Sequence, residues 1–136
     1  PPGQGLVELS AEVTAAVMAY ARANQGMMQS AYARALVDDH FAEGLRELRL
    51  RTRALLRLRF EPHVSVIGHP EPTLALEFAL SQAVAMLTAR HEARRVDVDA
   101  IEQGVFVREL VRSLLRYLEF PCEPSAIDAA LSARGL

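Results

Sequence analysis

The sequence predicts an all-α protein, folded as an antiparallel helical bundle of about five to six helices. Apolar side chains recur at helical rather than strand spacing along most of the chain. Proline, glycine and asparagine separate these stretches, and such residues end helices. The chain has 136 residues, of which 51% are hydrophobic, which is enough for one domain with one core over residues 1–136.

A first helix is expected over about residues 8–24. Apolar residues from Leu9 to Tyr20 have the spacing of one helical face. The run Asn24-Gln25-Gly26 is a stop signal, and Gly26 is suited to the left-handed conformation that ends many helices.

The second and third helices follow this signal. The second, with Met28 on its apolar face, is expected to end near Asp38. The side chain of Asp38 or Asp39 can cap the third helix by accepting a hydrogen bond from its first backbone N–H groups. The expected core face of the third helix is its apolar stripe, made of Phe41, Leu45, Leu48, Thr52, Leu55 and Leu56.

Residues 61–72 form the main break in the pattern. Their prolines and Gly68 argue against any regular element there. The fourth helix is expected to start at about Pro72, where proline suits the first helical position, and to end near His91. Three apolar residues of the break are expected to be loop residues that pack onto the core: Val64, Val66 and Ile67.

The last two helices have start signals of their own. The fifth is expected to begin near Asp99, with Glu102 three residues later completing a capping box, and to end at Phe120. A second capping-box pattern begins at Ser125 and opens a short final helix that stops at Gly135.

The fourth and fifth helices are predicted to be apolar on more than one face, whereas an ordinary surface helix has one apolar stripe about 100° wide. A second copy of the pair, related by a two-fold axis, would cover the extra faces and form a four-helix bundle. The alternative is that one helix is central within the monomer and the other is merely well covered. The expected dimer interface consists of Leu76, Leu80, Val84, Leu87, Phe106, Val107, Leu110, Val111, Leu114 and Leu118.

Two segments resemble the C-terminal domain of the TetR family of bacterial transcription regulators. Residues 69–72 (HPEP), followed by 74–79 (LALEFA), are similar to the start of that domain's penultimate long helix. Residues 107–118 (VRELVRSLLRYL) are similar to its last long helix, with the closing Tyr-Leu. The resemblance extends over roughly residues 6–120.

This resemblance implies an effector-sensing and dimerisation domain. In the family, the last two long helices form the four-helix bundle of a homodimer, and the other helices enclose a pocket for a small-molecule effector. The N-terminal helix-turn-helix of the family has no counterpart in these residues. Any contact with DNA would therefore come from an N-terminal domain absent from this sequence.

Pockets for small effectors are mostly apolar, with a few polar groups. Bulky or adaptable side chains on the first, second and fourth helices are the candidates, although each of them could simply fill the core. Gln82 stands in an apolar run and needs a partner if it is buried. The expected ligand-binding residues are Met18, Tyr20, Met27, Met28, Tyr32, Phe78, Gln82 and Met86.

The sequence predicts neither an enzyme nor a cofactor, because it has no nucleophile motif, phosphate-binding glycine loop or closely spaced cysteine pair. His63 and His69 share a loop but lack the spacing of a helical metal site, so no metal is expected. The single cysteine, Cys122, fits a reducing compartment, which favours the cytoplasm. No membrane span is expected, since the most apolar run, 74–87, is shorter than the roughly 20 residues required.

An arginine stripe on the third helix permits a second hypothesis, a helical nucleic-acid-binding module. Arg46, Arg49, Arg53 and Arg57 lie on one face of that helix. The net charge of −2 and the lack of clustered aromatic residues disfavour this hypothesis. A solvated face with arginine stems along apolar surface explains the stripe more simply. A third possibility is an adaptor that dimerises without a ligand.

Overall fold

The computed structural model of the chain describes residues 2–91 and 101–136. Within these residues the protein is all-helical, with no strand, as the sequence predicts. The elements are α1 (Pro2–Ala23), α2 (Gln25–Ala35), α3 (Asp39–Phe60), the 3₁₀ helix η1 (Glu61–Val66), α4 (Pro72–His91), α5 (Gln103–Tyr117) and α6 (Pro124–Ser132).

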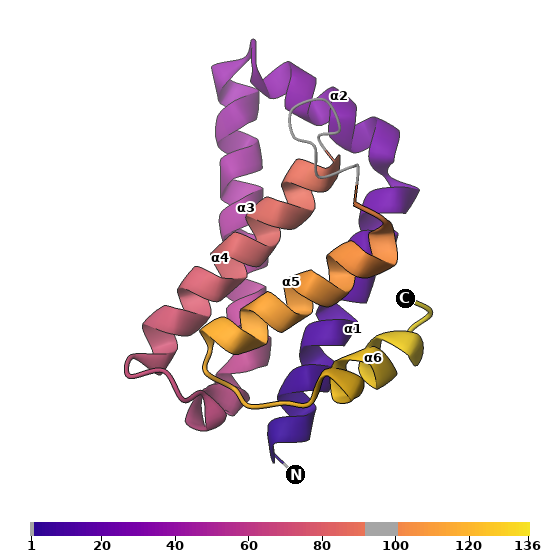
Figure 1. The fold of residues 1–136 in the computed structure, drawn as a ribbon. Coiled ribbons are helices and arrows are strands. Elements are labelled where there is room, and N and C mark those ends of the chain that lie inside the picture. The colour runs from indigo at the N-terminus through magenta and orange to yellow at the C-terminus, as the bar shows by residue number, and fades with distance from the viewer. Residues whose placement is uncertain (1, 92–100) are drawn as a thin grey trace.

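The helices form an antiparallel bundle (Figure 1). In this view α4 and α5 lie at the front, α3 and α1 lie behind them, and α2 crosses the top from α1 to α3. The short helix α6 packs beside the N-terminal part of α1 at the bottom. The first and last helices of the sequence are therefore neighbours in space.

The core is formed mainly by α1, α4, α5 and α6, with η1 and the end of α3 beneath them. Helix α2 has no buried residue, and Phe60 is the only buried residue of α3. The expected core face of α3 is therefore wrong over most of its length, since Leu48 and Leu55 are 58% and 65% exposed. The reason is that α3 turns its arginine side toward α4, where Arg53 and Arg57 contact the side chains of Ser81 and Glu77.

The sequence predicted the boundary between α2 and α3 correctly, but not the start of α1 or the role of Gly26 at the boundary between α1 and α2. Helix α1 already begins at Pro2, earlier than expected, and the side chain of Leu6 in its first part is fully buried. Gly26 lies inside α2 and not in a left-handed cap, so that prediction is wrong; Asn24, with φ −118°, separates the two helices. Asp38 does cap α3, because its carboxylate accepts a hydrogen bond from the backbone N–H of Phe41 at 3.0 Å.

Residues 61–66 form a 3₁₀ helix where the sequence predicted no regular element. Pro62 is compatible with it because the first N–H groups of a helix have no internal partner. The predicted packing of the apolar residues is confirmed, since Ile67 is 8% exposed and Val64 and Val66 pack against the core. Val64 and Val66 lie in the 3₁₀ helix, however, and not in a loop.

Helices α5 and α6 start differently from their predicted capping boxes. Asp99 lies outside the described residues, and α5 begins after Glu102, which is itself the cap. The Glu102 carboxylate accepts hydrogen bonds from the N–H groups of Gly104 and Val105 at 2.9 and 3.0 Å, and these bonds lower its pKa. Ser125 lies inside α6, which starts with a proline, so the second capping box is wrong.

Both α5 and α6 end in a residue with left-handed backbone conformation. At the end of α6 this residue is Gly135, with φ 73°, where the sequence predicted the stop. At the end of α5 it is Glu119, with φ 52°, so the helix ends at Tyr117 and not at Phe120. The N–H of Phe120 donates to the carbonyl of Leu115, and the N–H of Glu119 donates to that of Arg116, both at 3.0 Å, which is a Schellman motif.

Replacing Glu119 by glycine is expected to raise the free energy of unfolding by about 1 kcal/mol. A residue with a β-carbon is strained in the left-handed region, and glycine is not. Urea denaturation measures the change. The control is Glu109→Gly, in the interior of α5, where glycine is expected to lower stability by about 1 kcal/mol. Equal effects of the two variants would contradict the conformational explanation.

Candidate functional site

Helix α4 bears apolar side chains on more than one face, as the sequence predicted. Its inner side is buried in the core, through residues such as Leu76 and Leu80, each 2% exposed. Its other side bears three large apolar side chains that are 43–57% exposed, together with an exposed glutamine and alanine. We call this side the outer face of α4; it consists of Leu74, Phe78, Gln82, Ala85 and Met86.

Helix α5 has only one apolar face, so the prediction that it is apolar on more than one is wrong. Its buried residues all lie on the side toward the core: Phe106, Val107, Leu110, Val111 and Leu115. Its opposite side is exposed and mostly charged, with Arg108, Glu109, Arg112, Ser113 and Arg116. The high apolar content of α5 thus comes from one complete face, and its own chain covers that face.

Most residues predicted at a dimer interface lie in the core of the single chain. Val84 and Leu114 are half-buried. The other eight are each 9% exposed or less: Leu76, Leu80, Leu87, Phe106, Val107, Leu110, Val111 and Leu118. A second copy of the chain could reach only the outward sides of these helices. The pairing of α4 and α5 with a second copy remains a prediction.

The predicted ligand-binding residues do not gather around one cavity. Met18 lies in the core, 1% exposed, whereas Tyr20 and Met27 are each 58% exposed. Met28 and Tyr32 are half-buried, and the guanidinium of Arg49 lies 5.1 Å from the Tyr32 ring centre. The remaining three are exposed on the outer face of α4: Phe78, Gln82 and Met86.

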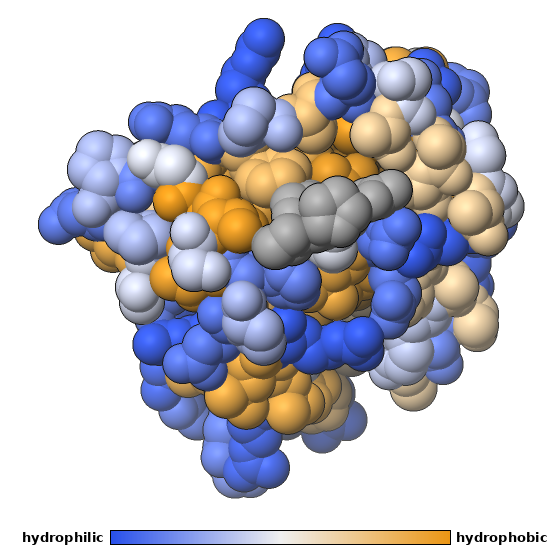
Figure 2. All heavy atoms as spheres, turned by 90° about the horizontal axis from the view of Figure 1, so that it is seen from below, coloured by the Kyte–Doolittle hydropathy of each residue, from blue (hydrophilic) through white to orange (hydrophobic). Residues whose placement is uncertain are grey.

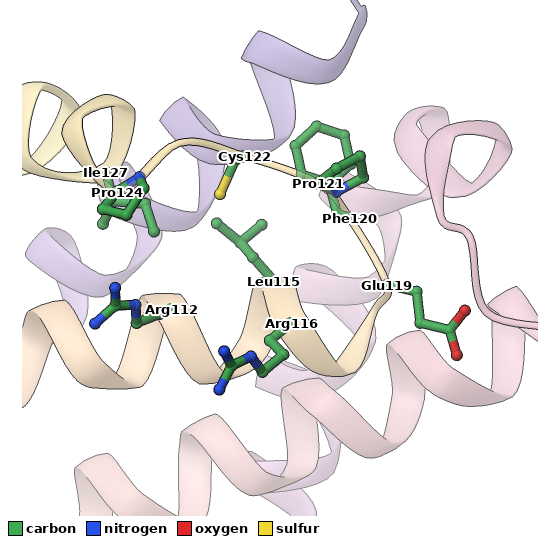
Figure 3. A pocket seen from close by; sticks show the side chains of 9 residues that line it. All are labelled: Arg112, Leu115, Arg116, Glu119, Phe120, Pro121, Cys122, Pro124 and Ile127. Carbon is green, nitrogen blue, oxygen red and sulfur yellow. The ribbon is translucent and has the colours of Figure 1, made fainter.

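Three open hollows lie between the helices instead. The first, of about 370 Å³, lies between α5, α6 and the segment that joins them (Figure 3). The second, of about 380 Å³, separates α3 from α4, and the third, of about 430 Å³, lies between α1 and α6.

Seen from below, apolar side chains form patches near the middle of the lower face, bordered by hydrophilic ones (Figure 2). None of the eight predicted ligand residues lines any of these three hollows.

Several arginines of α3 are paired with carboxylates of the same chain. Arg46 contacts Glu43 at 2.6 Å, and the interaction lowers the pKa of that carboxyl. Arg51 contacts Glu47 at 2.7 Å, both within α3. Arg57 and Arg59 reach other helices, where they pair with Glu77 of α4 and Glu12 of α1. Two of the four arginines of the predicted stripe, Arg46 and Arg57, are among these pairs, which partly neutralises the positive charge that a phosphate-binding stripe would need.

Two of the histidines have structural neighbours. The ring of His63 lies against Gly5 of α1, where an added β-carbon would meet its Cε1 atom at 3.0 Å. The Nδ1 atom of His69 accepts a hydrogen bond from the N–H of Glu71 at 3.1 Å, and its ring lies 5.6 Å from that of Tyr117. Within the described residues, no three histidine, cysteine or acidic side chains are grouped to hold a metal ion, and no helix is long and apolar enough to span a membrane.

Comparison with known proteins gives no assignment. No protein-family model, no curated protein sequence and no solved structure matches the chain. The surfaces described above are therefore the basis of the functional proposal.

Proposed function

We propose that the chain is the effector-sensing and dimerisation domain of a TetR-like bacterial transcription regulator, and that two copies associate through the outer face of α4. It would act in the cytoplasm, bind a small, mostly apolar molecule, and transmit this binding to a DNA-binding domain outside the present sequence. The observation that supports association best is the uncharged apolar stripe along the exposed side of α4.

This stripe is suited to helix pairing. Leu74, Phe78 and Met86 supply large apolar groups, and Ala85 between them is small enough to let a second helix approach closely. Phe78 is held in place by the ring of Tyr117, 5.2 Å away between centres. Removing such side chains from water is favourable, and none of the five residues of the outer face carries a charge that would have to be desolvated.

The exposed leucines of α3 are a less suitable surface. Leu48, Leu55 and Leu58 are 58–65% exposed, but charged side chains, Glu47 and Arg51 among them, lie on the same side of the helix. Burying those charges in an interface would carry a desolvation penalty that the outer face of α4 avoids. We therefore assign the dimer contact to α4.

Effector binding would act by shifting the relative populations of two arrangements of the protomers. An effector that favours one arrangement changes the spacing between the DNA-binding domains attached to the two copies. The size of the shift is limited by the difference in the effector's affinity for the two arrangements.

Light scattering after gel filtration tests the dimer, with the mass determined at several protein concentrations. The parent protein is expected near twice 15.0 kDa. The double variant Leu74→Glu/Met86→Glu places two charges on the outer face of α4 and is expected to give 15.0 kDa. The matched control, Leu48→Glu/Leu55→Glu on α3, is expected to remain dimeric.

Circular dichroism and thermal melting of both variants show whether the helical fold is retained. A parent protein that is monomeric at every concentration overturns the proposal. Dissociation by the α3 variant, with the α4 variant still dimeric, moves the contact to α3 and overturns the assignment to α4.

A further inference from the structure

We infer that the hollow between α5, α6 and their connecting segment binds a small amphipathic carboxylate, with the carboxylate at Arg112 and Arg116 and the hydrocarbon part against Leu115 and Phe120. We call it the α5–α6 hollow. This inference names the chemical class of effector, and its regulatory meaning rests on the proposed function. Binding itself can be tested independently of dimerisation.

The floor of the α5–α6 hollow is apolar and belongs to the core. Leu115 is 1% exposed and Ile127 is 3% exposed, and both line the hollow. The ion pair between Arg108 of α5 and Asp128 of α6, at 2.7 Å, ties the two helices together at one end. The hollow is therefore formed by packed elements of the fold, with space of about 370 Å³.

The two arginine side chains that line the α5–α6 hollow lie on one side of its apolar floor. Arg112 and Arg116 are one helical turn apart on α5, and both line the hollow (Figure 3). Arg112 makes only a 3.3 Å contact with Glu109, and within the described part of the chain no hydrogen bond or ion pair engages the side chain of Arg116. Guanidinium groups bind carboxylates strongly because they donate charge-assisted hydrogen bonds.

The surrounding charges favour a monoanion. Glu119 also lines the hollow, but its carboxylate points away from the two arginines (Figure 3). Glu109 and Glu123 are also nearby, so the attraction for an anion comes from direct contact with the two guanidinium groups and not from a net positive charge. These carboxylates repel a ligand group with one negative charge, such as a carboxylate, less than a phosphate group with two.

Cys122 forms part of the wall and is also a natural reporter. Its sulfur points into the hollow toward Leu115 (Figure 3), and it is the only cysteine in the sequence. Burial raises the pKa of its thiol, Glu123 raises it further, and Arg112 acts in the opposite direction. We therefore expect the thiol to react slowly at neutral pH, and a ligand bound beside it to slow the reaction further.

The test measures how fast N-ethylmaleimide modifies Cys122, by intact-mass spectrometry, at increasing concentrations of octanoate. Octanoate is expected to slow the modification in a saturable way. Octanol, which has the same chain length and no charge, is expected to protect at least about tenfold more weakly. Arg116→Gln should weaken octanoate binding by a similar factor, whereas Arg51→Gln on α3 should leave it unchanged.

Three results would overturn the inference: no protection by octanoate in the folded protein, equal protection by octanol, or unchanged octanoate binding in Arg116→Gln. The same samples are passed through light scattering with and without octanoate. A dimer without protection of Cys122 rejects the ligand site alone. Protection of Cys122 in a monomer rejects the proposed dimer alone.

Discussion

Replacing Phe60 by alanine is expected to lower the free energy of unfolding by about 3–5 kcal/mol, the range for truncating a large buried aromatic side chain. Phe60 is 1% exposed and is the only buried residue of α3. It joins α3, and through it α2, to the core. Alanine would leave a cavity at the point where this part of the bundle is anchored.

Urea denaturation followed by circular dichroism measures this loss. The control is Leu58→Ala, two residues earlier on the same helix and 62% exposed, where a change below about 0.5 kcal/mol is expected. If the two substitutions lowered stability equally, Phe60 would not be the anchor of α3.

Replacing Gly68 by alanine is expected to lower the free energy of unfolding by about 1–3 kcal/mol, the range for forcing extra atoms into a packed site. A β-carbon at Gly68 would lie 2.7 Å from the backbone oxygen of Glu119 and 3.2 Å from its Cβ. The segment cannot simply move away, because the N–H of Gly68 donates a hydrogen bond to the carbonyl of Leu118 at 3.1 Å.

The matched control is the same substitution at Gly44. This glycine lies within α3, and no atom lies within 4 Å of an added β-carbon. Gly44→Ala is therefore expected to raise stability by about 1 kcal/mol, because alanine favours a helix more than glycine does. Thermal melting should show shifts of opposite sign. A stabilised Gly68→Ala variant would contradict the close approach of the two segments.

The elements that sequence reasoning located well are those fixed by local chemistry. The start of α4 at Pro72 and the cap of α3 at Asp38 depend on a few neighbouring residues. The stop at Gly135 likewise follows from the freedom of glycine in the left-handed region. The left-handed Glu119 could not be predicted in this way, because its conformation accompanies a contact with Gly68, about 50 residues earlier in the chain.

The faces of the helices were harder to predict than their positions. Helical periodicity identifies an apolar stripe, but not the side on which a neighbouring helix will pack. On α3 the apolar stripe faces away from the core, and the arginine side faces α4. On α4, Leu76 lies inward and Phe78 outward, so the three residues of this helix that were expected to bind a ligand are exposed and available to a second copy.

The α5–α6 hollow was missed because its parts are apolar, basic and sulfur-containing residues without a motif. In the sequence, Arg112 and Arg116 look like an ordinary charged helix face, and a single cysteine indicates only a reducing compartment. Only the turn at Glu119 brings Phe120 and Cys122 back over α5. No local signal in the sequence marks that turn as the edge of a hollow.

The packing of α6 against α1 has a consequence for the order in which the protein can fold. Val7 of α1 lines a shared hollow with Ala126 and Ala130 of α6, more than 100 residues later in the sequence. During synthesis on the ribosome, the apolar side of α1 emerges long before the helix that covers it. That side of α1 therefore stays uncovered until α6 has also been synthesised, and an uncovered apolar helix is prone to associate with other chains in this interval.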